Sequence, residues 1–111
     1  WEGSTSFLLT DDDAVRRFGD DAFSIAFARI ECHYFVNGGF LRSENQLLDD
    51  LHRIRHIPAV IVQGRYDVVC PMRTAWELHR AWPEAEFHVV PNAGHSALEA
   101  GITHELVKAT D

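Results

Sequence analysis

The sequence has few of the features that would place a protein in a special class at once. It contains two cysteines among 111 residues, Cys32 and Cys70, and they do not stand in C-x-x-C spacing. Two cysteines in this arrangement indicate neither a disulfide framework nor a cysteine-based zinc site. With no secretory leader visible in the sequence, we expect a reducing, cytoplasmic location.

Long apolar runs and clusters of basic residues are also lacking. The longest near-unbroken apolar run is residues 59–62, whereas a helix needs about 20 apolar residues to span a bilayer. The 10 Lys and Arg residues are scattered and the formal net charge is −7, although binding to a phosphate backbone requires clustered cations. We therefore expect no membrane segment and no nucleic-acid partner.

A metal or cofactor site has little support. His52 and His56 stand at i and i+4, a spacing that can hold a metal, but no third ligand or H-E-x-x-H pattern accompanies them. The sequence thus predicts neither a metal ion nor another cofactor.

What is present is the composition of an ordinary folded protein. Hydrophobic residues make up 46% of the chain and charged residues 24%, far from a disordered composition. The length suits one small domain with a modest core. Because the chain opens on Trp1 rather than Met, we expect it to be part of a longer protein.

The first half of the chain has a helical pattern. An acidic run at residues 11–13 is typical of a helix start. Residues 20–36 place apolar side chains at spacings of three and four, and Asn37-Gly38-Gly39 follows as a stop that tolerates the left-handed region. A weaker amphipathic pattern predicts another helix over residues 44–54.

The second half alternates between strand and helix patterns. Residues 59–63 form a β-branched apolar run between Pro58 and Gly64, which predicts a buried parallel strand. Residues 86–90 predict a second strand, with a helical pattern over 73–82 between the two. Ser96 is a candidate cap for a last helix from 97 to about 108. This order predicts an α/β fold with parallel strands, which places ligands outside the strands' carboxyl ends.

Asp67 and His95 each come shortly after one of these strands. Serine hydrolysis needs an imidazole to take the nucleophile's proton and a carboxylate to orient and stabilise that imidazole. The acid precedes the base here, as in one known chain order, and their spacing of 28 residues accommodates one helix and one strand. The alternative interpretations are that Asp67 is a turn former and His95 a polar loop residue.

Two groups of residues resemble a known family. Gly64-Arg65-Tyr66-Asp67 together with Ala93-Gly94-His95 is similar to the end of the proline iminopeptidases, the prolyl aminopeptidase branch of the α/β-hydrolases. Trp1-Glu2-Gly3 and the segment 28–35 resemble that family's helical cap and its junction. The resemblance implies part of a cap over residues 1–56 and the C-terminal part of the α/β-hydrolase core over residues 57–111.

The resemblance also implies roles for four residues. Asp67 and His95 would be the acid and base of a catalytic triad, and Glu31 and Glu2 would hold the free α-amino group of a peptide that begins with proline. Physics supports Glu31, since its i−4 and i+4 neighbours are aromatic and a carboxylate on an apolar face gains from a cationic ligand. A carboxylate paired with arginine or lining a solvated edge is the alternative.

The chain departs from the family in lacking a Gly-x-Ser-x-Gly nucleophile motif. We therefore expect it to be inactive alone and, with a sheet edge and helix faces uncovered, to self-associate. Two other functions remain open: another α/β-hydrolase, acting on an ester, epoxide or haloalkane, or a non-catalytic interaction module.

Overall fold

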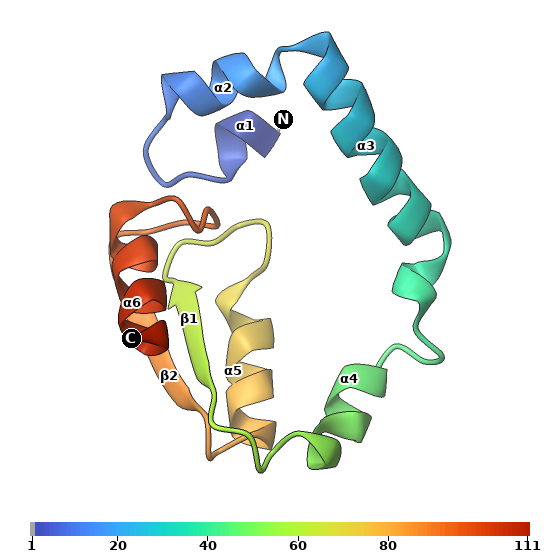
Figure 1. The fold of residues 1–111 in the computed structure, drawn as a ribbon, viewed down its shortest axis with the longest axis vertical. Helices are drawn as coiled ribbons and strands as arrows, with labels where there is room; N and C mark the ends of the chain where they lie inside the picture. The colour runs from blue at the N-terminus through green and yellow to red at the C-terminus, as the bar shows by residue number, and fades with distance from the viewer. Residues whose placement is uncertain (1) are drawn as a thin grey trace.

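The computed structural model describes residues 2–111, which follow an open, ring-like path (Figure 1). Helices α1 to α3 arch from the strands' carboxyl ends down one side, and α4 leads back to the strands. The elements in chain order are α1 (Glu2–Thr5), α2 (Asp12–Phe18), α3 (Asp21–Val36), the 3-10 helix η1 (Gly38–Phe40), α4 (Gln46–Asp49), the 3-10 helix η2 (Asp50–Arg53), β1 (Val60–Gly64), α5 (Met72–Ala81), β2 (Glu86–Val90) and α6 (Ala100–Thr110).

The two strands form a parallel pair, with α5 as the crossover between them. The register runs from Val60 opposite Glu86 to Gly64 opposite Val90, so both strands end at the same edge. This confirms the predicted α/β order. Because loops that follow adjacent parallel strands meet at one edge, the loops bearing Asp67 and His95 become neighbours.

Two small buried clusters lie on opposite faces of this sheet. Leu51, Trp82 and Ala85 form one, against Ile61 of β1, and Val90, Ala93 and Ile102 form the other, against Val62. Successive residues of a strand point to opposite faces, so β1 serves both clusters at once. The sheet is therefore covered by α5 on one face and by α6 on the other.

Two helices of the first half begin at aspartate caps, and the predicted glycines follow the end of α3. Asp11 accepts a hydrogen bond from the Ala14 amide at 2.8 Å to begin α2, and Asp20 accepts one from Phe23 at 2.8 Å to begin α3. After α3 ends, Gly38 and Gly39 adopt φ of +57° and +63°, in the left-handed region that glycine enters without strain.

Two predicted helices differ from the structure. The expected helix over 44–54 is one turn, α4, followed by the 3-10 helix η2, and Asn45 makes no side-chain cap. The final helix begins at Ala100 rather than 97, with Glu99 at its N-cap position. Ser96 does not cap it, because the Ser96 hydroxyl accepts from the Leu98 amide at 3.2 Å within the preceding turn.

Across residues 2–111, none of the helices combines the length and the apolar character needed to cross a membrane.

Candidate active site

The loops that follow β1 and β2 are joined by main-chain hydrogen bonds. The Arg65 amide donates to the Val90 carbonyl at 2.9 Å, and the Tyr66 amide donates to the Ala93 carbonyl at 3.0 Å. The approach is so close that a Cβ atom on Gly64 would lie 1.8 Å from the Gly94 oxygen. Only glycine fits at position 64, which explains why this residue begins the Gly-Arg-Tyr-Asp segment.

The Asp67 carboxylate is almost fully enclosed, with 6% of the side chain exposed. Its Oδ1 accepts from the amides of Val69 and Cys70 at 2.9 and 2.8 Å. Its Oδ2 lies 3.0 Å from Nδ1 of His95 and accepts from Nε2 of Gln63 at 3.3 Å. One carboxylate oxygen closes a turn and the other contacts the His95 imidazole. Asp67 can therefore be both a turn former and the acid that orients His95.

The His95 side chain is 37% exposed and presents its second nitrogen away from Asp67. An ionised carboxylate can only accept, so with Asp67 ionised the proton resides on Nδ1 and Nε2 is left as the basic nitrogen. This is the tautomer that a general base requires when it takes a proton from a nucleophile.

The His95 loop is held in place by the segment after α1. The Ser6 carbonyl accepts from the amides of both His95 and Ser96, at 2.9 and 2.7 Å. Glu99 adds a second link, since its Oε1 accepts from the Gly94 amide at 2.8 Å and its Oε2 from the Leu8 amide at 3.1 Å. The chain's first helices are therefore tied directly to the loop that positions the imidazole.

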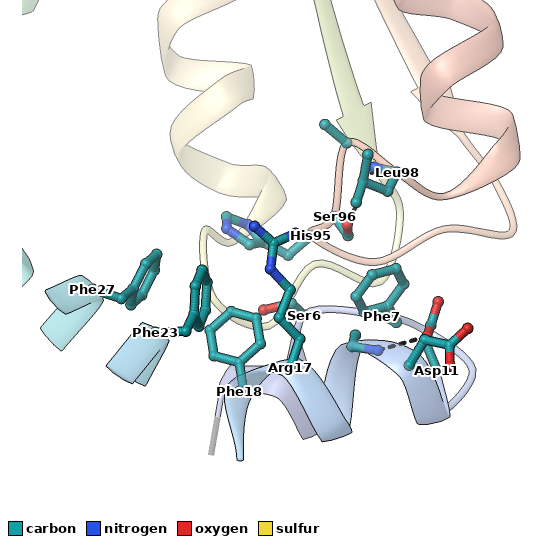
Figure 2. Close-up of a pocket in the computed structure, with 13 residues that line it drawn as sticks. Ser6, Phe7, Asp11, Arg17, Phe18, Phe23, Phe27, His95, Ser96 and Leu98 are labelled. Carbon is teal, nitrogen blue, oxygen red and sulfur yellow. Dashed lines mark hydrogen bonds between the residues drawn. The ribbon is translucent and has the colours of Figure 1, made fainter. Parts of the chain in front are cut away.

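A pocket of about 590 Å³ opens beside His95, between this loop and the helices α2 and α3 (Figure 2). Its aromatic wall is a cluster of Phe18, Phe23 and Phe27, with ring centroids 5.3 to 5.8 Å apart. The described lining is Ser6, Phe7, Asp11, Asp13, Ala14, Arg17, Phe18, Phe23, Phe27, His95, Ser96, Ala97 and Leu98. A volume of this size is typical of small-molecule sites.

Two of the four predicted site residues meet in the described part of the structure. Asp67 and His95 are in contact, whereas Glu31 lies half-buried on α3, one turn beyond Phe27, and is not among the described residues that line the pocket. Residues four apart share a helix face, so Glu31 continues the face that carries the aromatic wall. The Glu2 main chain begins α1, but its side chain lies outside the described part of the structure.

Cys70 lies beside the acid of this pair. Burial raises the pKa of the Cys70 thiol, and the negative charge of Asp67 raises it further. The thiol therefore stays protonated at neutral pH, where a thiolate would be needed for a nucleophile.

Among the side chains that the structure describes, residues 3–111, no group of three or more His, Cys, Asp or Glu is arranged to hold a metal ion.

Three residues of this site escaped the sequence-based prediction. Ser6 acts through its carbonyl, which no side-chain pattern reveals. Glu99 follows His95 by four residues, but no motif distinguishes it from the other acidic residues of the chain. In the sequence Arg17 looks like an ordinary exposed arginine of a helix. Only the structure shows that it lines the same pocket as His95.

Comparison with known protein families assigns the fold to a class. A family model described as TAP-like protein matches residues 24–105, most of the chain. The chain belongs to this family of α/β-hydrolases, and the parallel pair β1 and β2 with flanking helices is part of that fold.

The individual relatives are more specific. The chain is 61% identical over its whole length to a probable proline iminopeptidase of Leptolyngbya boryana, of which it covers 35%. It is 60% identical to the proline iminopeptidase of Xanthomonas citri and 58% identical to that of Arabidopsis thaliana, covering 36% and 29% of them. The chain thus spans about a third of the length of the curated relatives it matches.

Proposed function

We propose that the protein is a serine hydrolase that releases proline from the N-terminus of peptides, and that this chain supplies the acid Asp67 and the base His95 of its catalytic triad. The observation that carries the proposal is the 3.0 Å contact between the enclosed Asp67 carboxylate and Nδ1 of His95, at the shared edge of two parallel strands. The names of the similar proteins supply the substrate class.

In this reaction, Nε2 of His95 takes the proton of a serine hydroxyl as the serine oxygen bonds to the carbonyl carbon of the proline residue. The protonated imidazole then gives that proton to the departing amine, which leaves an acyl-enzyme for water to hydrolyse. Asp67 keeps the imidazole oriented and stabilises its charged form. The serine belongs to the two-thirds of the protein length that these 111 residues do not span.

The division of the chain follows from the same proposal. Residues 1–56 contribute part of a helical cap and residues 57–111 the C-terminal part of the core. Glu31, half-buried on the face that continues the aromatic wall, and Glu2 at the start of α1 would bind the substrate's cationic imino group. Without the nucleophile the 111-residue chain has no complete active site.

The test uses the full-length protein and the chromogenic substrate proline p-nitroanilide. His95→Ala removes the base, so we expect kcat to fall about 10³-fold or more, and Asp67→Asn should cause a loss of similar order by removing the acceptor that fixes the tautomer. His104→Ala, at an exposed position on α6, is the matched control and should retain full activity. Full activity in the His95 variant would overturn the proposal.

A second comparison separates this function from other hydrolase chemistry. The wild-type rate on proline p-nitroanilide is measured beside the rates on a short acyl ester and on an epoxide. Faster turnover of the prolyl amide is the expected result, and turnover of the ester or epoxide alone would assign the protein to another branch of the α/β-hydrolases. Turnover of none of them would favour a non-catalytic module.

A further inference from the structure

The pocket beside His95 contains a cation that the proposed chemistry does not use. Arg17 extends from α2 past the aromatic wall toward His95 (Figure 2). Its Cζ atom lies 4.6 Å from the ring centroid of Phe23, a cation–π contact that fixes where the guanidinium sits.

The carboxylates nearby on α2 have other partners. Asp11 accepts from the Ala14 amide as the helix cap, and Asp13 pairs with Arg16. Among the side chains of residues 3–111, no carboxylate lies at ion-pair distance from Arg17. The guanidinium lines the pocket without a carboxylate partner among these side chains.

A guanidinium has the planar fork of donors that matches a carboxylate, and an arginine that stacks on an aromatic ring is held ready for such a pair. The surrounding wall is apolar, with Phe7, Phe18 and Leu98 among its lining. An apolar side chain and a carboxylate at one end of a molecule are the features of the C-terminal residue of a peptide.

Resting on the proposed function, we infer that this pocket is the subsite for the leaving part of the substrate, with Arg17 binding the free C-terminal carboxylate of a dipeptide or tripeptide. The scissile carbonyl must lie beside Nε2 of His95, and each further residue adds about 3.5 Å of reach. A volume of about 590 Å³ lies within the range of small-molecule sites and leaves room for the residue beyond the scissile bond.

The substrate pair that tests this differs only at the carboxylate: Pro-Phe with a free C-terminus and Pro-Phe with a C-terminal amide. Proline release by the full-length protein is measured for both as kcat/KM. A charge-assisted pair at a partly exposed site predicts a wild-type preference for the free acid of roughly tenfold.

Arg17→Gln should abolish that preference, chiefly through a higher KM for the free acid, and Arg17→Lys should restore part of it as a point charge. Arg16→Gln is the matched control, since Arg16 is the neighbouring arginine of α2, pairs with Asp13 and does not line the pocket. It should keep the wild-type ratio of the two substrates. Thermal melts of all three variants check that the fold is unchanged.

The outcomes separate the two proposals. Release of proline from both peptides with no preference for the free acid, or a preference that survives in Arg17→Gln, would overturn the carboxylate subsite and leave the proline-releasing function standing. No release from either peptide by the wild-type protein would instead overturn the proposed function itself.

Discussion

Glu99 connects two separate parts of the chain through a single carboxylate. Its oxygens accept from the amides of Gly94 and Leu8, so the residue that precedes His95 and the segment after α1 share one half-buried acceptor. Hydrogen bonds to a charged acceptor are about twice as strong as neutral ones. Glu99 is therefore a positioning residue that acts through the His95 loop.

Glu99→Gln keeps the size of the side chain but leaves only one acceptor oxygen. We expect kcat of the full-length protein to fall roughly tenfold with little change in KM, because the imidazole loses its fixed position while the substrate contacts persist. Glu44→Gln, at an exposed position, is the control. A lower melting temperature with unchanged kcat would mean that Glu99 only stabilises the fold.

The raised pKa of the Cys70 thiol gives a separate prediction. Alkylation by iodoacetamide requires the thiolate, so its rate at Cys70 should reach half-maximum at a pH above the ordinary thiol value. Asp67→Asn removes the smaller cause and leaves burial, the larger one, so the midpoint should move part of the way down. Site-resolved mass spectrometry over a pH series measures this, and an unchanged midpoint in the variant would exclude a contribution from the Asp67 charge.

At the scale of elements, β1 and the loop after β2 pack so closely that the contact does not tolerate a side chain at position 64. The Gly94 oxygen occupies the space where a side chain at position 64 would begin. Main-chain contacts thus hold the carboxyl ends of the two strands together, and the contact between Asp67 and His95 depends on these main-chain contacts.

Gly64→Ala should force these loops apart. Overpacking of this kind costs about 1–3 kcal/mol of unfolding free energy, and we expect most activity to be lost as Asp67 and His95 separate. Gly38→Ala is the comparison, since a Cβ there meets nothing within 4 Å and only the strain of a positive φ is added, about 1 kcal/mol. Equal losses for the two variants in denaturant titrations would contradict the steric explanation.

Elements set by local chemistry were predictable, and those set by distant contacts were not. The strand at 86–90 and the helix α3 appeared within one residue of their predicted bounds, because β-branched runs, an acidic cap and paired glycines act over a few residues. The start of α6 was wrong because Ser96 closes a turn, with its hydroxyl accepting from the Leu98 amide, in a loop that the distant Ser6 carbonyl holds through the amides of His95 and Ser96. The contact of Asp67 with His95 followed from strand order alone.

At the scale of the whole molecule, the chain is more extended than a domain of its length. Its radius of gyration is 15.7 Å, against about 13 Å for a compact domain of this size. Helix α3 has no buried residue, and Phe35 and Val36 are 74% and 81% exposed. An apolar helix with this much exposed surface needs a covering partner.

We therefore predict that the 111-residue chain, expressed alone, self-associates through α3. Sedimentation should give a mass above that of one 12.6 kDa chain, and Phe35→Ser combined with Val36→Ser should shift it toward the monomer. Arg29→Ser, also exposed on α3, should leave the distribution unchanged. A wild-type chain that sediments as a stable monomer would show that the exposed face does not drive association.

The Ser6 carbonyl, which accepts from two successive amides at the base of the loop, has a consequence for protein engineering. The acceptor is a main-chain carbonyl, so any residue at position 6 can form these hydrogen bonds. A substitution of the Ser6 side chain therefore leaves both hydrogen bonds in place. Under the proposed division of the chain, residues 1–56 of a distant relative could be joined to residues 57–111 of this chain without disturbing the His95 loop, provided that the path of the backbone through residues 6–8 is kept.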